Sequence, residues 1–327
     1  MMKEELLSLL RERNEYVSGQ ELCRHFGVSR TAIWKAVNRL KEAGYEIEAV
    51  PNKGYRVLSC PDSVAAVEVS SLMETDVIGR DVRYMETIDS TNLYARRLGE
   101  DGAAEGVLVV ADEQTAGKGR SGRHWTTPPG SAIAMSVLLR PRIAPERISM
   151  VTLVMGLAVA KAVRELYGLD ALIKWPNDVV VNGKKICGIL TEMSAELMAV
   201  NYIVIGVGIN SNMKEFPEEI RTTATSIALE LGRDVSRARL IAEVMKHFET
   251  LYRSFLETSD LSGIMSDYNT ILVNIGRRVR VLEPGNEYSA KALGIDRNGR
   301  LLVRTDEGTV RDVYAGEVSV RGIYGYV

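Results

Sequence analysis

The sequence predicts an α+β protein made of three domains. Before residue 62, apolar residues at helical spacing are followed by two short β runs; from 63 to 270, strand patterns alternate with helices; from 271 to 327, short strands are separated by glycine turns. Alternating strands and helices are typical of a layered α/β unit, whereas short, regularly spaced strands predict a small β-barrel. The 327 residues allow two or three domains of ~150 residues each.

Composition narrows the class of protein. Apolar residues make up 46% of the chain and charged residues 26%, which is ordinary for a globular protein. The net charge of −2 provides no global basic field, so any nucleic-acid binding needs a local patch. Three widely spaced cysteines give no disulfide or zinc pattern, and the longest apolar stretch, 148–163, is too short for a membrane span. We therefore expect a cytoplasmic protein with no membrane partner and no signal peptide.

Residues 1–62 carry the pattern of a helix-turn-helix. Leucines at 6–10 predict an opening helix, and Ser18 with Glu21 forms a capping-box signature for a second one. A short turn containing glycine, 27–29, separates it from a third helix that runs from residue 30 to about 43. On the third helix, Ile33 and the apolar residues four and seven positions after it are predicted to face inward. Polar and basic groups lie on the other faces, as they do on a recognition helix. The candidate DNA-contacting residues are Ser29, Arg30, Thr31, Trp34, Lys35, Asn38 and Arg39, together with Lys53.

Lys53 lies at the tip of a predicted hairpin. Two β runs, 45–50 and 54–58, flank the turn-forming residues 51–54, which completes a winged helix-turn-helix. The alternative is a domain that mediates protein contacts or is a relic, because the net charge of residues 1–60 is only +2. A single module of this kind binds weakly, so we expect a homodimer on a two-fold operator. Residues 60–63 are interpreted as the linker.

The middle domain is predicted to be a mixed α/β unit. A polar cap, 89–92, opens a helix after the first strand and is either a ligand site or plain capping. The expected strands are 82–88, 106–111, 132–139, 172–175, 179–181, 185–192 and 202–207, and the expected long helices are 148–167 and 236–256. The polar segment 213–227 is predicted to be a second mobile loop.

The stretch from Gln114 to Trp125 has the composition of a ligand-binding loop. It places three glycines and three cations within residues 117–123. Glycine lets backbone N–H groups approach a ligand closely, and the cations supply positive charge for an anion. Such a loop suits closure over an anionic ligand. The alternative is a solvated surface loop.

A second motif, Lys174-Trp-Pro-Asn-Asp178, follows a short strand. Pro176 fixes a turn, and Asn177 and Asp178 place polar groups near the ammonium of Lys174. A buried cation beside an anionic ligand stabilises charge that develops at a carboxylate or phosphate. The alternative is a simple salt bridge.

Four segments, in this order, resemble the biotin–protein ligases: 114–125, 174–178, Cys187-Gly-Ile-Leu190 and Gly206-Val-Gly-Ile-Asn210. With the winged helix-turn-helix, the chain resembles the bifunctional kind that also represses biotin operons. The resemblance covers essentially the whole chain, and the first two motifs together are highly specific.

The resemblance implies a class II synthetase-like middle domain and an SH3-like carboxy-terminal barrel that helps to hold ATP or the acceptor. The implied activity is that of a biotin–[acetyl-CoA-carboxylase] ligase. Biotin and Mg·ATP would give biotinyl-5′-AMP, and a lysine of a biotin carboxyl carrier protein would accept the biotin. The implied partners are this carrier protein, operator DNA and a second copy of the chain; the implied cofactors are biotin as substrate, ATP and Mg²⁺.

The resemblance also implies site residues. The expected catalytic residues are Lys174, Arg120 and Arg123. The expected biotin-binding residues are Ser90, Thr91, Asn92, Gln114, Lys118, Gly119, Arg120, Lys174, Gly188, Ile189 and Leu190. Those expected at ATP or the adenylate are Gly117, Arg120, Arg123, Trp125, Asn210 and Asp178, with Gly122 helping the loop to fold. No metal ligand is assigned.

The sequence departs from the family pattern at two positions. Lys118 stands where the family often has Arg, which removes a bidentate fork, and Ser131 stands where a second glycine is expected. Two rival functions remain: a biotin-sensing repressor without catalysis and a lipoate-type ligase. Lys174 and the two loop arginines speak against the first, and the glycine- and arginine-rich loop favours biotin over lipoate.

Overall fold

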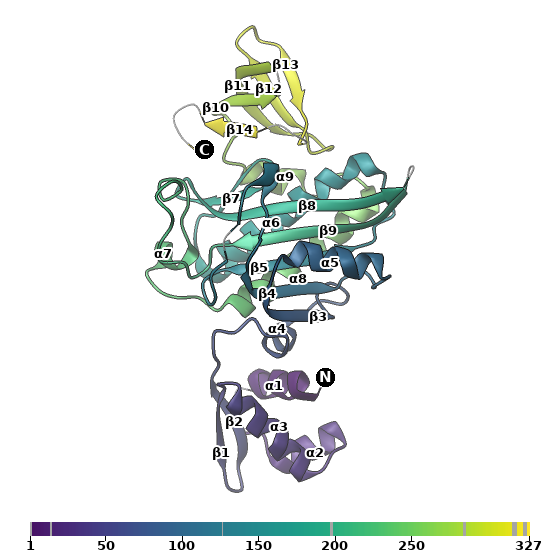
Figure 1. Ribbon diagram of the computed structural model, residues 1–327, viewed down its shortest axis with the longest axis vertical. Helices are drawn as coiled ribbons and strands as arrows, with labels where there is room; N and C mark the ends of the chain where they lie inside the picture. The colour runs from purple at the N-terminus through teal and green to yellow at the C-terminus, as the bar shows by residue number, and fades with distance from the viewer. Residues whose placement is uncertain are drawn as a thin grey trace.

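The computed structural model describes residues 2–13, 15–125, 127–196, 199–283, 286–315, 319–322 and 326–327. Three units follow one another along the long axis of the molecule (Figure 1). The amino-terminal unit lies at one end, a large sheet covered by helices lies in the middle, and a small β unit lies at the other end. This order agrees with the three domains that the sequence predicts.

The amino-terminal unit contains both caps that the sequence predicts. Ser18 Oγ accepts a hydrogen bond from the backbone N–H of Glu21 at 3.1 Å, and Ser29 Oγ accepts one from Ala32 at 3.2 Å. Gly27 takes φ +64°, in the left-handed region, and ends the second helix. The elements are α1 (Met2–Arg13), α2 (Gly19–Phe26), α3 (Arg30–Glu42), β1 (Glu46–Val50) and β2 (Gly54–Ser59).

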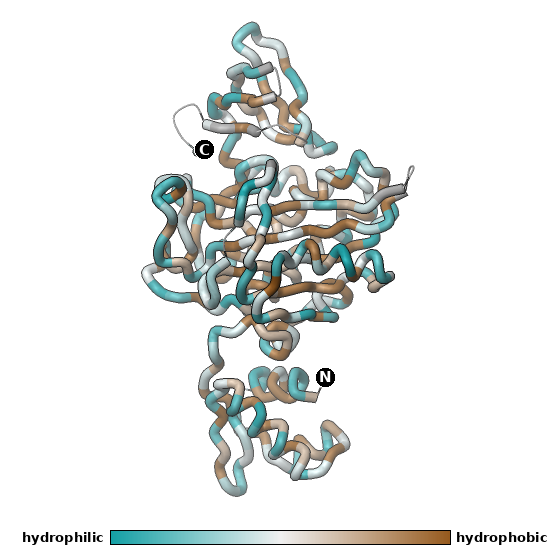
Figure 2. Tube along the Cα trace, viewed as in Figure 1, coloured by the Kyte–Doolittle hydropathy of each residue, from teal (hydrophilic) through white to brown (hydrophobic). Residues whose placement is uncertain are grey.

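The central unit is built on a seven-stranded sheet with the order β3-β4-β5-β9-β8-β7-β6. Only β3 and β4 are parallel; the other neighbours are antiparallel. Hydrophobic residues run along these strands (Figure 2). The strands are β3 (Val82–Ile88), β4 (Leu108–Gln114), β5 (Ile133–Leu139), β6 (Leu172–Lys174), β7 (Asp178–Val181), β8 (Lys184–Glu196) and β9 (Ala199–Ile209).

Two long helices pack against different groups of strands in the sheet. The helix α5 (Thr91–Glu100) packs on β4, β5 and β9, while α6 (Ile148–Tyr167) packs on β6, β7 and β8 and is covered by α8 (Arg237–Thr258). A Cβ at Gly156 of α6 would lie 3.7 Å from Ile189 Cδ1, an ordinary van der Waals distance, so there is room for a methyl group between this helix and the sheet. The shorter helices are α4 (Ala66–Leu72), α7 (Ile227–Leu231) and α9 (Met265–Thr270), with 3₁₀ turns at Arg120–Gly122 and Pro145–Arg147.

The carboxy-terminal unit is a five-stranded antiparallel sheet with the order β13-β12-β11-β10-β14. It corresponds to the SH3-like unit that the resemblance implies. The strands are β10 (Arg278–Glu283), β11 (Asn286–Ile295), β12 (Leu301–Thr305), β13 (Val310–Val313) and β14 (Ser319–Gly322). The sequence pattern predicts the last strand at residues 317–320, and the first two of these residues lie outside the described part of the chain.

Several elements differ from the prediction. The helix α6 has the predicted bounds, but β8 and β9 are longer than the predicted 185–192 and 202–207 because they pair with each other beyond their apolar centres. The sequence pattern missed α4, whose N-cap, Ala65, makes no side-chain capping bond. Among the described helices, none combines the length and the apolar character needed to cross a membrane.

Candidate active site

A pocket opens where the loop after β4 meets β8, β9 and the start of α5. Its open space is about 470 Å³, part of it continuous with solvent. The lining residues are Ser90, Thr91, Asn92, Gln114, Lys118, Gly119, Arg120, Trp125, Met135, Asn177, Lys185, Gly188, Ile189, Leu190, Gly206, Val207 and Gly208. All the expected biotin-binding residues except Lys174 therefore lie around one pocket.

Hydrogen bonds tie the start of α5 to the neighbouring strands. Gln114 Oε1 accepts from the backbone N–H of Thr91 at 2.9 Å and is 3.1 Å from its hydroxyl. Ser136 Oγ lies 2.8 Å from Thr91 Oγ1 and donates to Asn92 Oδ1 at 2.6 Å. Ser90 is the N-cap residue but makes no side-chain capping bond. Plain capping therefore does not explain the polar cluster. Ser90, Thr91, Asn92 and Gln114 line the pocket, whereas Ser136 is fully buried behind them.

Glycines on β9 make room for two pocket side chains. A Cβ at Gly206 would lie 2.1 Å from Asn92 Oδ1, and one at Gly208 would lie 2.3 Å from Trp125 Cε2. On β8, a Cβ at Gly188 would lie 3.2 Å from the ring of Trp125. Only glycine permits such an approach of a side chain to a strand backbone. Trp125 thus forms a wall of the pocket against two strands.

The glycine- and arginine-rich loop is folded by its own backbone. The N–H of Trp125 donates to Gly117 O at 2.9 Å, and that of Gly119 donates to Arg123 O at 2.7 Å. A Cβ at Gly117 would lie 2.3 Å from Trp125 O. Gly122 has φ +72°. The loop therefore needs glycine at 117 and 122 for a close approach and a left-handed turn.

Arg120 joins the loop to two other parts of the chain. Its Nη1 donates to Asn177 Oδ1 at 3.0 Å, and its Nη2 donates to Ala315 O in the carboxy-terminal unit at 3.3 Å. The amide of Asn177 in turn donates to Ile189 O at 3.0 Å. Burial lowers the pKa of Arg120. The guanidinium is thus partly removed from water and held at the pocket wall, where it can face an anion.

Lys174 and Asp178 form a buried charged group beside the pocket rather than in its lining. Lys174 is 6% exposed, and its Nζ lies 3.9 Å from Asp178 Oδ2. Lys185 Nζ lies 2.6 Å from the other carboxylate oxygen. Tyr326 donates its hydroxyl to Asp178, and its ring centroid is 4.3 Å from Lys174 Nζ. The chain therefore concentrates two ammonium groups around one carboxylate.

These charges decide the ionisation of Asp178. Burial alone would raise its pKa, but the ammonium groups of Lys185 and Lys174 outweigh burial and hold the pKa below its usual range. The carboxylate is therefore ionised at neutral pH and holds both lysines close together. This gives a fixed positive region next to the pocket.

Four of the expected nucleotide-site residues also lie outside the pocket lining: Gly117, Arg123, Asp178 and Asn210. Gly117 shapes the loop. Asn210 is 5% exposed, and its amide donates to Thr225 O at 3.0 Å. In this structure Asn210 therefore fixes the segment before α7, and its role at the nucleotide stays a prediction.

The sequence pattern did not single out Lys185, Met135 or Tyr326. Lys185 lines the pocket, and its ammonium lies 5.6 Å from the centre of a Trp125 ring. Its position just before Cys187-Gly188 was the signal that could have identified it. Met135 sits inside a uniformly apolar strand, and Tyr326 lies in the carboxy-terminal tail, so only the folded chain brings them to the site.

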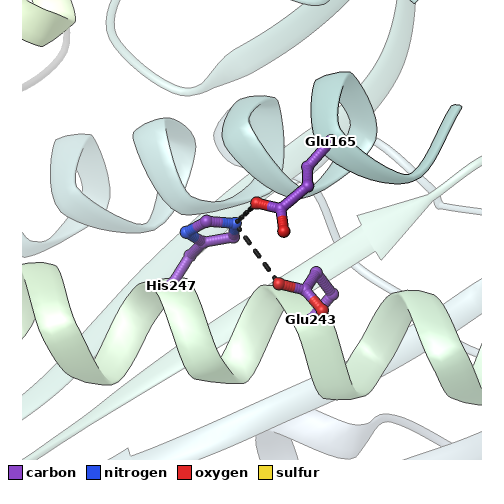
Figure 3. A group of neighbouring side chains, drawn as sticks. All are labelled: Glu165, Glu243 and His247. Carbon is purple, nitrogen blue, oxygen red and sulfur yellow. Dashed lines mark hydrogen bonds and ion pairs between the residues drawn. The ribbon is translucent and has the colours of Figure 1, made fainter. Parts of the chain in front are cut away.

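One group of metal-ligating side chains occurs among the described residues, and it lies elsewhere. Glu165 on α6 and Glu243 and His247 on α8 point toward one another (Figure 3). His247 Nε2 is 2.9 Å from Glu165 and 3.5 Å from Glu243. These two helices contribute no described residue to the pocket lining. We interpret the group as a hydrogen-bonded contact between the two helices.

The candidate recognition helix presents most of its expected contacts to solvent. Ser29, Arg30, Thr31, Lys35 and Arg39 are exposed, and Trp34 is 55% exposed; Asn38 is only partly exposed. Lys53 is exposed at the hairpin tip, with its ammonium 5.6 Å from the ring centre of Tyr16. The arrangement leaves a polar and basic helix face available to a partner.

Comparisons with known protein families agree with this three-part organisation. The biotin/lipoate A/B protein ligase family matches residues 84–210, an HTH domain model matches 3–56, and the biotin protein ligase C-terminal domain matches 275–321. These three ranges fall in the central, amino-terminal and carboxy-terminal units respectively.

Individual relatives span the whole chain. The bifunctional ligase/repressor BirA of Bacillus subtilis is 38% identical over 98% of each chain, and that of Escherichia coli is 31% identical over 97% of this chain and 96% of its own. The structure of a biotin protein ligase from Aquifex aeolicus in complex with biotin and ATP covers 74% of this chain and 99% of its own, with 31% identity and a TM-score of 0.66. The chain therefore belongs to the biotin protein ligase family, in its bifunctional ligase/repressor branch.

Proposed function

We propose that the protein is an ATP-dependent biotin–protein ligase that also represses biotin genes. The observation that carries this proposal is the single pocket shared by the α5 cluster, the glycine-rich loop and β8–β9, with Arg120 at its wall and Lys174 beside it. The polar groups and the cations that line this pocket suit a small acid that is activated by a nucleotide.

The first half-reaction forms the adenylate. A carboxylate oxygen of biotin attacks the α-phosphorus of Mg·ATP, the bond to the β-phosphate oxygen breaks, and pyrophosphate leaves. Lys174 stabilises charge on the carboxylate and the α-phosphate, and Arg120 and Arg123 pair with phosphate oxygens. Preorganised cations in a partly dry site stabilise such charge far better than water does.

The second half-reaction transfers the acyl group. The amine of a lysine on a biotin carboxyl carrier protein attacks the acyl carbon, the bond to the phosphate oxygen breaks, and AMP leaves. The folded loop and Trp125 keep water away from the mixed anhydride. In this proposal Mg²⁺ enters as part of the Mg·ATP substrate. Asp178 is engaged by Lys185 and Tyr326.

The binding end of the pocket recognises biotin through hydrogen bonds. Ser90, Thr91, Asn92 and Gln114 form the polar cluster that holds the ureido and thiophene rings, and the backbone of 188–190 lines the pocket. Lys118 and Gly119 also line the pocket. Buried donors and acceptors of this kind reject a ligand that leaves them unpaired.

An assay of pyrophosphate release can distinguish a biotin ligase from a lipoate-type ligase. Pyrophosphate release from ATP is measured with the full chain and either acid. We expect release that requires biotin, with lipoate at least about 100-fold less effective, because unpaired buried polar groups give discrimination of this size or more. Equal or greater release with lipoate would identify a lipoate-type ligase, and tight biotin binding without release would identify a sensing repressor.

We further propose that two copies of the chain bind one operator. Each copy would place α3 in the major groove and the hairpin tip with Lys53 near the backbone, with Arg30, Thr31, Trp34 and Asn38 nearest the bases. Adenylate would favour the dimer, provided that it binds the dimer more tightly than the monomer. The three cysteines are free thiols, which suits the cytoplasmic location that we propose.

A further inference from the structure

Residues from the carboxy-terminal part of the chain fix the backbone next to Lys174. The backbone N–H of Trp175 donates to Asn274 Oδ1 at 3.0 Å, and its indole Nε1–H donates to Gly299 O, just before β12, at 3.1 Å. The Trp175 side chain is fully buried. The backbone of Lys174 is therefore held from outside the pocket, and the direction of its ammonium depends on the groups around Nζ.

Tyr326 places a ring and a hydroxyl beside this ammonium. The ring centroid lies 4.3 Å from Lys174 Nζ, inside the ~6 Å limit for attraction between a cation and an aromatic face. The hydroxyl donates to Asp178 Oδ2. The next residue, Val327, lies at the turn between β7 and β8, because a Cβ at Gly183 would be 3.4 Å from Val327 Cγ2. Residues 326 and 327 therefore lie next to both ends of β7.

Both oxygens of the Asp178 carboxylate are engaged by groups other than Lys174. Oδ1 pairs with Lys185 Nζ at 2.6 Å, and Oδ2 accepts the hydroxyl of Tyr326. Lys174 Nζ stays 3.9 Å from Oδ2, whereas a direct hydrogen bond from an ammonium to a carboxylate is about 2.7–2.9 Å long. The ion pair of Lys174 with Asp178 is therefore too long for a direct hydrogen bond.

Tyr326 contacts both members of this ion pair, so it can control the separation between them. A lysine in direct contact with a carboxylate points its N–H groups at that carboxylate and has its charge largely offset there. An aromatic face holds an ammonium without cancelling its charge, because the ring carries no net charge. Tyr326 does not belong to the described lining of the pocket, so any effect on a ligand must pass through Lys174.

We propose that Tyr326 is a positioning residue that keeps the ammonium of Lys174 apart from Asp178 and directed toward the ligand in the neighbouring pocket. The inference rests on the proposed ligase function, because it takes adenylate formation as the step that Lys174 assists. Without the hydroxyl, Lys174 closes on Asp178 Oδ2, and its stabilisation of charge on the carboxylate and the α-phosphate weakens. The polar cluster at the start of α5 is untouched by this change.

Tyr326→Phe tests the proposal because it keeps the ring and removes the hydroxyl. The single-turnover rate of biotin-dependent pyrophosphate release is measured with the full chain over a range of biotin concentrations. We expect the maximal rate to fall by about 10-fold, the rate equivalent of losing one hydrogen bond to a charged group. The half-saturating biotin concentration should stay within about 2-fold, because the interaction acts on the chemical step and not on biotin binding.

Tyr16→Phe is the matched control and should keep the full rate. The hydroxyl of Tyr16 also donates to a carboxylate, that of Glu48, and Lys53 Nζ lies 5.6 Å from its ring centre. The same chemical change is therefore made in the DNA-binding unit, away from the pocket.

The double variant Lys174→Ala/Tyr326→Phe separates positioning from a merely structural role. If Tyr326 acts through Lys174, removing its hydroxyl should change the rate of Lys174→Ala by less than about 2-fold, because the effects of coupled residues do not add. Three results would overturn the proposal: the same fold-loss with and without Lys174, a full rate in Tyr326→Phe, or a raised half-saturating biotin concentration in place of a lower rate. Absence of biotin-dependent release from the unaltered chain would instead remove the ligase proposal, and this inference with it.

Discussion

At the scale of single residues, the site depends on where charge is buried. Lys174 is 6% exposed and shares Asp178 with Lys185. Because Asp178 remains ionised, two ammonium groups stay close together without a large repulsive cost. An anionic ligand that enters beside them meets positive charge that is already oriented, which is the condition for strong electrostatic stabilisation.

Replacing Lys174 with Ala tests this arrangement. Biotin-dependent pyrophosphate release should fall by ~10²–10³-fold, the usual effect of losing one preorganised group, while Lys185 still pairs with Asp178. Lys161→Ala, which removes a partly exposed ammonium of α6 that pairs with Asp267 of α9, serves as the control and should keep full activity. A loss of less than about 10-fold in Lys174→Ala would exclude Lys174 as the main electrostatic catalyst.

Gly208→Ala tests the wall formed by Trp125. The added Cβ would lie 2.3 Å from the indole ring, so the ring must move out of its place at the pocket. We expect biotin affinity, measured by calorimetry, to fall by about 10-fold or more, which corresponds to ~1.4 kcal/mol. Gly156→Ala is a matched control, because its Cβ would meet no atom closer than 3.7 Å. Equal affinity in the two variants would contradict the assignment of Trp125.

Residues of the candidate site could be predicted from the sequence where they belong to a recognisable motif. Eleven of the lining residues belong to the biotin or nucleotide sets that the family resemblance implies. Contacts across the fold could not be predicted. The approach of Asn92 to Gly206, and of Tyr326 to Lys174, requires segments more than a hundred residues apart to meet.

At the scale of elements, α8 holds two other segments of the chain in place. Arg237 at its start holds the linker, and Glu249 further along accepts hydrogen bonds from the backbone N–H groups of residues 76–78, the nearest at 2.7 Å. Burial alone would raise the pKa of Glu249, but these N–H donors lower it overall. The helix therefore fixes the loop between α4 and β3 through one ionised carboxylate.

Glu249→Gln gives a prediction for pH dependence. Because the folded-state pKa is below the ordinary value of 4.5, the stabilisation is present above that pH and is lost as the pH falls through the folded pKa. At pH 7 the variant should lose ~1.5–3 kcal/mol of unfolding free energy, the usual contribution of bonds to a charged group. Between pH 5 and about 3, denaturant titration should show a smaller loss of stability in the variant than in the unaltered protein. Parallel pH curves would show that Glu249 is not the titrating group.

The bounds of an element could be predicted where the apolar pattern and the end signal in the sequence agreed. The helix α6 has the predicted bounds because apolar periodicity continues to a glycine that ends it in the left-handed conformation. By contrast, the ends of β8 and β9 are set by pairing between strands, which the local pattern does not report. The helix α4 begins without a capping side chain, so no start signal marked it.

At the scale of the whole molecule, the units meet through apolar packing and through polar contacts, and buried residues of the central and carboxy-terminal units form one core. Arg120 bonds Ala315 in the carboxy-terminal unit, and Asp62 and Glu68 attach the DNA-binding unit. The order of the domains could be predicted from composition and spacing. The contacts that attach the domains to one another could not be predicted, because the linker carboxylate of Asp62 and its partner Arg237 are 175 residues apart.

Lys35→Ala tests the DNA-binding face of α3. If Lys35 neutralises a phosphate, its removal should weaken binding to a mixed-sequence duplex and lower the slope of log affinity against log salt by about 0.9. Fluorescence anisotropy at several salt concentrations measures both quantities. Lys214→Ala, an exposed lysine of the central unit paired with Asp234, should change neither. The same salt slope for Lys35→Ala and the unaltered chain would place Lys35 off the DNA.

The most direct test of the whole account is covalent transfer. The full chain is incubated with biotin, ATP, Mg²⁺ and a purified biotin carboxyl carrier domain, and the mass of the carrier is followed. The account predicts that one lysine of the carrier gains biotin, that AMP and pyrophosphate appear in equal amounts, and that neither is seen without biotin. Biotin that binds the chain but never reaches the carrier or releases pyrophosphate would contradict the ligase function and leave a biotin-sensing DNA-binding protein.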